Sequence, residues 1–150
     1  MPIRMWTEQD IKVVFSLLQE LNEALNEDQD IRMNDIVKHY NEMTKSKDIY
    51  ENYVYEEDGA VIGFLSLIHY RSVYHKKGTT LINELVVLKG SRNKGIGGEL
   101  LKYGIERAKE KGMDEIEVGV MKKNTKAIEF YKEHGITEEY YLLGMEFKDK

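Results

Sequence analysis

A glycine-rich turn between an apolar stretch and an amphipathic helix constrains this chain more than any other feature. The segment NELVVLKGSRNKGIGGELL runs from Asn83 to Leu101, with apolar residues at 85–88 and glycines at 90, 95, 97 and 98. Glycine lets backbone approach a bulky group closely, and the first turn of a helix presents N–H groups without intrahelical partners. The helix dipole favours negative charge at the same end. The segment therefore predicts a strand, an anion-binding turn and a helix.

Three phosphate-binding motifs contain a glycine-rich turn of this kind, and each requires different residues at fixed positions. A P-loop needs Lys and Ser or Thr directly after its last glycine, but Gly95 is followed by Ile96 and Gly97. A dinucleotide-binding turn would place its third glycine at position 100, where Leu100 stands. The pattern that fits is Arg92-x-x-Gly95-x-Gly97. This pattern resembles the pyrophosphate signature of the GNAT superfamily of acetyl-coenzyme A dependent N-acetyltransferases.

Length and composition limit the classes of protein that need to be considered. The chain has 150 residues, 41% of them hydrophobic, which predicts one domain over residues 1–150 with its own core. It contains no cysteine, which excludes disulfides, zinc-thiolate sites and thiol nucleophiles, and its four histidines are too scattered for a metal site. The net charge of −5 argues against a general nucleic-acid role. We find no signal peptide and no apolar stretch of membrane-spanning length, so we expect a soluble, cytoplasmic protein that binds no membrane.

The pattern of apolar residues predicts an α/β (α+β) fold. Asp58-Gly59 between two β-rich runs is a strong hairpin signal, and the run VIGFLSLI after it is apolar on both faces, as in a central strand. Expected strands cover residues 3–6, 50–56, 60–70, 85–88, 115–121 and 138–147. Expected helices cover residues 7–25, 34–44, 95–111 and 124–135, the first opening with a capping box at Thr7 and Asp10. We expect a mixed, mostly antiparallel central sheet with helices on both faces.

The resemblance to the GNAT superfamily extends well beyond the turn. The segments ELVV, RNKGIG, GGELLKYGIERAKEKG, EIEVGV and NTKAIEFYKEHG follow one another in the order and spacing of the GNAT core, over residues 81–136. One departure is Ile136, which stands where the family usually has an aromatic residue. The resemblance implies transfer of an acetyl group from acetyl-CoA to a primary amine by direct attack, without a metal or a covalent enzyme intermediate.

The same resemblance implies which residues bind acetyl-CoA. Backbone groups of Leu85, Val86 and Val87 would pair with the pantetheine arm as though it were a neighbouring strand. The pyrophosphate would be held by N–H groups of Arg92, Asn93, Lys94, Gly95, Ile96, Gly97 and Gly98. The side chains of Arg92 and Lys94 either add charge there or are solvated turn cations. Asn124 corresponds to a position that often meets the cofactor arm, and it is also a good N-cap.

Two residues are candidates for the chemistry. An alkylamine with a pKa of about 10.4 is only about one part in 2500 neutral at pH 7, a penalty of about 4.6 kcal/mol, so a base or a water path is needed. Glu84 occupies the family position of an acidic base or amine anchor, with a surface salt bridge or ordered water as the alternative. A base at neutral pH requires a pKa raised by burial. Tyr131 matches the family tyrosine that protonates the leaving thiolate, although helical spacing alone would make it a core aromatic.

The acceptor is the least constrained part of the prediction. We expect a small amine or a polyamine as the acceptor, with a peptide N-terminus or a lysine as the alternative. A different class also stays open, because the fold permits a non-catalytic acyl-CoA-binding sensor or interaction module. Many relatives are homodimers, so a homodimer in which the last strand pairs across subunits is a further expectation.

Overall fold

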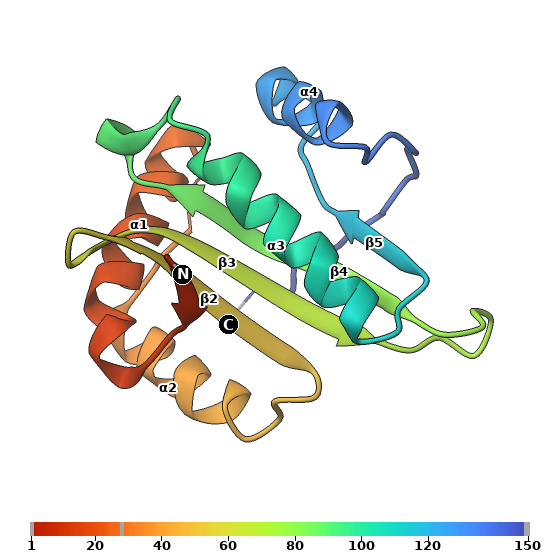
Figure 1. Ribbon diagram of the computed structural model, residues 1–150, viewed down its shortest axis with the longest axis horizontal. Coiled ribbons are helices and arrows are strands. Elements are labelled where there is room, and N and C mark those ends of the chain that lie inside the picture. The colour runs from red at the N-terminus through yellow and green to blue at the C-terminus, as the bar shows by residue number, and fades with distance from the viewer. Residues whose placement is uncertain (1, 28, 149–150) are drawn as a thin grey trace.

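The computed structural model describes residues 2–27 and 29–148, and a five-stranded sheet runs through its centre (Figure 1). The strands follow one another across the sheet in chain order: β1 (Ile3–Met5), β2 (Tyr50–Glu57), β3 (Ala60–Tyr70), β4 (Thr79–Val87) and β5 (Glu115–Val118). The first four pair antiparallel, and β5 pairs parallel to β4. The predicted mixed, mostly antiparallel sheet is confirmed.

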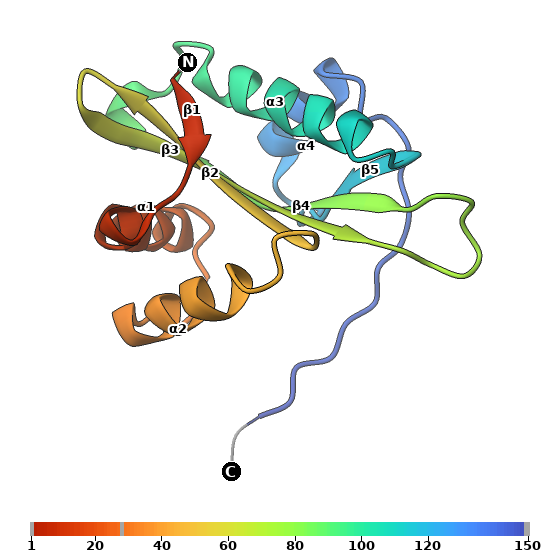
Figure 2. The ribbon, with the colours of Figure 1, turned by 60° about the horizontal axis from the view of Figure 1, so that its bottom comes forward.

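Helices cover both faces of the sheet, as predicted (Figure 2). The first face carries α1 (Ile11–Ala24) and α2 (Met33–Met43), and the second carries α3 (Ile96–Glu110) and α4 (Thr125–Glu133). Short 3-10 turns at Glu8–Asp10 and Lys89–Ser91 precede α1 and α3. None of the helices in the described residues combines the length and apolar character needed to cross a membrane.

Local sequence signals explain where the first helix and the central hairpin form. The Asp10 carboxylate accepts the Thr7 backbone N–H at 2.7 Å, which is the predicted capping box, and the guanidinium of Arg4 holds both oxygens of that carboxylate at 2.8 and 3.0 Å. In the β2–β3 turn, Asp58 and Gly59 both have positive φ, 52° and 80°. Asp and Gly tolerate that conformation better than most residues, which is why the hairpin closes at this dipeptide.

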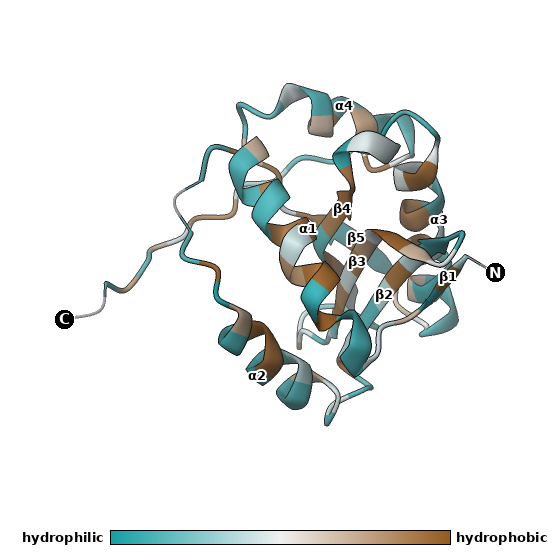
Figure 3. Ribbon diagram, turned by 90° about the vertical axis from the view of Figure 1, so that its left-hand side faces the viewer, coloured by the Kyte–Doolittle hydropathy of each residue, from teal (hydrophilic) through white to brown (hydrophobic). Residues whose placement is uncertain are grey.

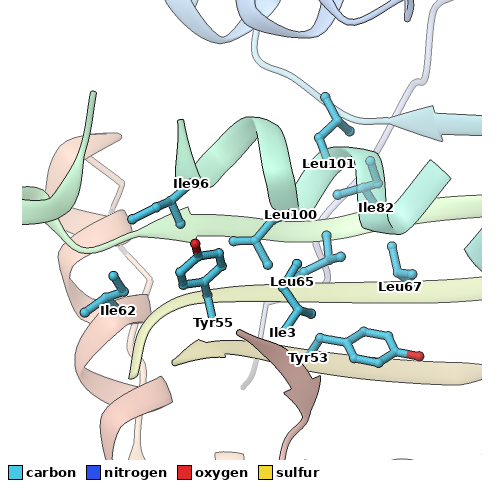
Figure 4. Packing of buried hydrophobic residues seen from close by; sticks show 10 residues of the cluster. All are labelled: Ile3, Tyr53, Tyr55, Ile62, Leu65, Leu67, Ile82, Ile96, Leu100 and Leu101. Carbon is cyan, nitrogen blue, oxygen red and sulfur yellow. The ribbon is translucent and has the colours of Figure 1, made fainter. Parts of the chain in front are cut away.

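The side chains of β3 alternate between two core clusters, so the strand is buried on both faces. Leu65 and Leu67 pack with Leu100 and Leu101 of α3 on the second face (Figure 4). Phe64 packs with Val14, Leu17, Val54 and Val86 on the first face, under α1. The predicted central position of this strand is confirmed. Ribbons coloured by hydropathy show the apolar residues turned toward the sheet from both helical layers (Figure 3).

The pairing of β4 changes in the middle of the strand. Ser66 of β3 lies opposite Glu84, but Leu67 lies opposite Ile82, so Asn83 is an extra residue in a β-bulge. On its other side β4 pairs with β5 only as far as Ile82, opposite Val118. From Asn83 to Val87 the edge of β4 that faces β5 has no strand partner in the part of the chain that is described.

Three predictions about the elements were wrong. β5 ends at Val118 rather than Met121, because β4 stops pairing with it at that point. Residues 138–147 form no strand; they run away from the sheet, with Leu142, Leu143 and Phe147 each more than nine-tenths exposed (Figure 2). An extended segment becomes a strand only by pairing, and this one meets no sheet edge. β4 begins at Thr79 and not at residue 85, so the predicted strand missed its first six residues.

A buried carboxylate ties α3 to the second face of the sheet. The side chain of Glu51 is 2% exposed, and Arg107 of α3 donates to its two oxygens at 2.8 and 3.1 Å. The Tyr53 hydroxyl donates to the same carboxylate at 2.6 Å. His69 Nε2 lies 3.0 Å away but is poorly aligned for a hydrogen bond. Burial alone would raise the pKa of Glu51, yet the contacts with His69, Arg107 and Tyr53 outweigh it and hold the pKa well below its usual range.

Candidate active site

The unpaired edge of β4 provides the first part of the site. Leu85, Val86 and Val87 pair with β3 on one side, opposite Leu65, Phe64 and Gly63. Val86 packs under α1, whereas Leu85 and Val87 pack toward α3, so the side chains hold the strand between both cores. Backbone groups on the other side have no strand partner among the described residues, and an extended ligand arm can bind there as an added strand; the Val87 carbonyl also accepts a hydrogen bond from Arg92. The structure places the three predicted residues at this edge.

The turn after β4 leads directly into the start of α3. Asn93 and Gly95 have positive φ, 70° and 80°, which turn the chain sharply. The first helical hydrogen bond is donated by the Glu99 N–H to the Gly95 carbonyl at 3.0 Å. The N–H groups of Ile96, Gly97 and Gly98 therefore have no acceptor within the helix, and they sit at its positive end. This arrangement is suited to binding an anion such as a pyrophosphate.

The Arg92 side chain is directed back at the protein rather than outward from the turn. Its Nε donates to the Val87 carbonyl at 3.1 Å, and its Nη2 lies 3.5 Å from the carboxylate of Glu20 on α1. The Lys89 N–H donates to that same carboxylate at 2.6 Å. The contacts fix the turn against α1. Lys94 is exposed in the same turn, where its charge adds to the positive potential.

Gly98 has a role that the sequence did not reveal. A Cβ atom on Gly98 would lie 3.0 Å from Nε2 of His134, a contact so tight that the imidazole of α4 would have to shift by a few tenths of an ångström. His134 Nδ1 donates to the Phe130 carbonyl at 2.8 Å, which fixes the ring. A Cβ on Gly97 would meet the Phe130 ring at an ordinary 3.5 Å. Of the two glycines, Gly98 therefore serves the packing of α4 on α3 as well as the turn.

Asn124 lies at the start of α4, as predicted. Its side-chain oxygen accepts the Ala127 N–H at 3.3 Å, which confirms its role as an N-cap. It also lines a pocket of about 320 Å³ between the end of α1 and the segment before α4, together with Ala24, Leu25, Asn26, Met121 and Lys123. The same side chain is thus a cap and part of a pocket wall, and its contact with the cofactor arm stays a prediction.

Tyr131 is half-buried on α4 and packs against the core of the second face. Its ring meets that of Phe130 edge to face, with centroids 5.2 Å apart. Burial raises the pKa of Tyr131 to about 12, so the phenol keeps its proton throughout the physiological range. The side chain has the chemistry of a hydrogen-bond donor and not of a base.

Glu84 follows the bulge and lies on the first face, opposite Ser66 of β3. Burial raises the pKa of Glu84 above its usual 4.5, while the neighbouring Ser66 hydroxyl and the charge of His39 on α2 oppose part of that rise. A pKa raised above the usual value of a carboxyl group is what a general base at neutral pH needs. Glu84 and Tyr131 thus lie on opposite faces of the sheet, on either side of the region where β4 and β5 part.

Sequence analysis did not identify Ser66 and His39, the two residues that lower the pKa of Glu84 against the effect of burial. Ser66 is 2% exposed in the middle of an apolar strand, and that interruption of VIGFLSLI was an available signal. His39 is exposed on α2 and gave no signal, because only the packing of α2 on the sheet brings it near Glu84. Both residues affect the protonation of the candidate base.

A family model described as the acetyltransferase (GNAT) family matches residues 14–136. This protein belongs to that family, as the pattern of the turn and its neighbouring segments predicted.

Curated relatives are similar over little more than half of this chain. An N-acetyltransferase of Methanocaldococcus jannaschii, described as uncharacterized, is 34% identical over 93 residues, which cover 61% of this chain and 41% of that relative. A similarly described N-acetyltransferase of Archaeoglobus fulgidus is 33% identical, over 63% of this chain and 65% of its own length. The aminoalkylphosphonate N-acetyltransferase of Salmonella typhimurium is 31% identical, over 56% and 54%. The chain thus spans between 41% and 65% of the length of these relatives.

Solved structures are similar over nearly the whole chain. A transcriptional regulator from Bacillus halodurans C-125 superposes with a TM-score of 0.86 at 25% identity, covering 97% of this chain and 98% of that one. A putative acetyltransferase from Agrobacterium tumefaciens reaches a TM-score of 0.85 at 16% identity, covering 98% and 100%. The second similarity supports the fold alone.

Proposed function

We propose that this protein is an N-acetyltransferase that moves the acetyl group of acetyl-CoA to a primary amine. The observation that carries the proposal is the unpaired edge of β4 from Asn83 to Val87, which ends at the anion-binding start of α3. The pantetheine arm of acetyl-CoA would bind Leu85 to Val87 as an added strand, and its pyrophosphate would meet the N–H groups of residues 96–98. This arrangement directs the thioester toward the region between Glu84 and Tyr131.

The proposed reaction needs one proton acceptor and one hydrogen-bond donor. The acceptor ammonium first loses a proton to Glu84, directly or through water. The amine nitrogen then attacks the thioester carbon, and the carbon–sulfur bond breaks as the amide forms. The second proton that the nitrogen loses passes through solvent to the departing thiolate. Tyr131 would donate a hydrogen bond to the departing sulfur. Coenzyme A and the N-acetylated amine are the products, and no covalent bond to the protein is made.

For the acceptor we propose a small primary amine or a polyamine. The similarity to an aminoalkylphosphonate N-acetyltransferase favours a small molecule over a peptide N-terminus or a protein lysine. The test is a panel of amines incubated with the protein and acetyl-CoA, with thiol release followed continuously and the N-acetyl product identified by mass spectrometry. We expect release above the amine-free background for a subset of small amines. Release with peptides only would reverse the choice of acceptor.

A non-catalytic acetyl-CoA sensor is the second candidate. The observation that favours it is the fold similarity, at a TM-score of 0.86, to a protein described as a transcriptional regulator. The amine panel separates the two candidates when it is combined with calorimetry of acetyl-CoA binding. Tight binding without thiol release for every amine would select the sensor.

Replacing Glu84 with glutamine is expected to remove the acidic limb of the kcat/KM profile. Because burial raises the pKa of Glu84, the wild-type rate should fall as pH drops through a value above 4.5. Glutamine does not titrate, so the variant should follow only the ionisation of the acceptor. The measurement is kcat/KM against pH with one acceptor.

Ser66→Ala is the matched control for that profile. The Ser66 hydroxyl lowers the pKa of Glu84, so its loss should move the acidic limb to higher pH while keeping the limb. An acidic limb that is the same in all three proteins would leave Glu84 as an amine anchor or a bystander.

We also propose that the protein is a homodimer in which the tail of each copy pairs with the sheet of the other. The support is the exposed apolar tail, with Tyr141, Leu142, Leu143 and Phe147 each more than 80% exposed, and the outer edge of β5, which pairs with no strand among residues 2–27 and 29–148. Such a surface is typical of association. Light scattering should give twice the chain mass for the full chain and the single mass after removal of residues 138–150. A monomeric full chain would contradict the proposal.

A further inference from the structure

A pocket beneath α2 lies on the same face of the sheet as Glu84. It has a volume of about 150 Å³ and is lined by Met5, Trp6, Tyr40, Met43, Thr44, Lys47, Tyr50 and Asn52. We call it the α2 pocket. Its walls are mainly aromatic rings and thioethers, with the rings of Trp6 and Tyr40 5.0 Å apart. A cavity of about 150 Å³ accommodates a group the size of a benzene ring.

The Asn52 side chain is a buried polar group that lines this pocket. Asn52 is only 4% exposed, and its Nδ2 donates to the Sδ atom of Met43 at 3.5 Å. A thioether is a weak acceptor, so this contact satisfies an amide poorly. Buried polar groups are nearly always hydrogen-bonded, which indicates that a ligand with its own polar group would complete the site.

A row of three polar residues connects the pocket to the candidate base. Asn52 pairs with Ser66 on the next strand, and Ser66 pairs with Glu84 on the one after. Neighbouring strands are about 4.8 Å apart, so the pocket and Glu84 are separated by about 10 Å. Helix α2 passes over both, since Tyr40 and Met43 line the pocket while the charge of neighbouring His39 acts on Glu84. One elongated molecule is long enough to occupy both positions.

The charge of the pocket distinguishes between kinds of acceptor. Lys47 is its one charged lining residue, and among the described residues it takes part in no ion pair. A second ammonium group in the pocket would be repelled by Lys47. A carboxylate or phosphonate would be attracted to Lys47 and would accept a hydrogen bond from Asn52.

We propose that the α2 pocket binds the far end of the acceptor, and that the acceptor is a primary amine whose other end carries an acidic group. The amine lies at Glu84, the apolar body lies against the rings of Trp6 and Tyr40 that line the pocket, and the acidic group meets Lys47 and Asn52. This inference rests on the proposed function, and it selects acid-bearing amines over polyamines among the small amines considered above.

The test compares ω-amino acids and diamines of matched chain length, alkyl and aryl, as acceptors. We expect kcat/KM to favour the amino acids, most strongly where the chain spans the distance from Glu84 to the pocket. Lys47→Glu should shift that preference toward the diamines by roughly tenfold, because one ion pair is lost and one repulsion is gained. Lys45→Glu is the matched control; Lys45 is exposed, pairs with Glu42 and lies outside the pocket, so the preference should not move. Equal use of both series by the wild type, or an unchanged preference in Lys47→Glu, would overturn the proposal.

A second measurement does not depend on turnover. Trp6 is the only tryptophan in the chain and lines the pocket, so its fluorescence reports occupancy directly. Titration with the ω-amino acids should change the Trp6 emission at lower concentration than the matched diamines do, and Lys47→Glu should abolish that difference. A fluorescence response without thiol release would count against the acetyltransferase and support the pocket. Thiol release with no discrimination between the two series would support the acetyltransferase and contradict the pocket.

Discussion

Replacing Tyr131 with phenylalanine is expected to lower kcat about 100- to 1000-fold, the effect of removing one donor from a developing anion. The affinity for acetyl-CoA should stay nearly unchanged, because the ring and its packing are kept. Burial raises the pKa of Tyr131 to about 12. A thiol has a pKa of about 8.5, so complete proton transfer to the thiolate is uphill by about 3.5 units, or about 4.8 kcal/mol. Tyr131 therefore acts by donating a hydrogen bond in the transition state and keeps its proton.

Single-turnover rates and acetyl-CoA binding by calorimetry would separate the two effects. Tyr103→Phe is the matched control, since Tyr103 of α3 is also half-buried but packs edge to face on Tyr53 of β2, with ring centroids 4.8 Å apart. We expect its kcat to match the wild type. A Tyr131→Phe protein that turns over at full speed would remove the proposed role, and one that loses acetyl-CoA affinity instead would make Tyr131 a binding residue.

Replacing Glu51 with alanine is expected to lower the free energy of unfolding by about 3 kcal/mol, the lower end of the range for breaking a buried ion pair. The lower end applies because Arg107, left without its carboxylate, is 26% exposed and regains some contact with water. The Tyr53 hydroxyl would lose its acceptor in the core as well. Urea unfolding followed by circular dichroism measures the change.

Glu110→Ala provides the control, because Glu110 pairs with the same Arg107 at 2.6 Å but is 62% exposed. An exposed pair contributes about 0–1 kcal/mol, so this variant should stay near the wild type. The pKa of Glu51 is held below its usual 4.5, so its contribution is present above that pH and is lost as the pH falls through the lower folded value. The Glu51→Ala protein should accordingly lose less stability in acid than the wild type. Equal effects of the two substitutions would show that burial does not matter here.

Local signals were enough to predict most elements of the fold. The Asp58-Gly59 turn, the capping box at Thr7 and the apolar stripe of α3 depend on residues close together in the chain. The tail at 138–147 was predicted wrongly because alternation shows that a segment suits a strand but not whether a partner strand is available. The bulge at Asn83 had no recognisable signal, and it depends on the pairing of two strands.

The candidate site was likewise predicted where it depends on contiguous residues and missed where it depends on the packing of distant ones. The turn from Arg92 to Gly98 was predicted from its own sequence, since glycines and a helix start are contiguous there. The buried carboxylate of Glu51 with His69 and Arg107 was missed, because those residues are far apart in the chain and only the packing of α3 brings them together. The same holds for the row from Asn52 to Glu84, which crosses three strands.

The extra residue in β4, Asn83, determines on which face of the sheet the Glu84 side chain lies. Side chains two positions apart on a regular strand point the same way, so without Asn83 as a bulge Glu84 would share the α3 side with Ile82. The bulge instead turns Glu84 to the α2 side, where Ser66 and the pocket lie. If Asn83 paired as an ordinary strand residue, the acetyl-CoA motif would be unchanged in the sequence, but the side chains of β4 before Glu84 would lie on the opposite faces of the sheet. A relative whose strand lacks this bulge could thus carry every motif of the family and still place its acidic residue on the α3 face of the sheet.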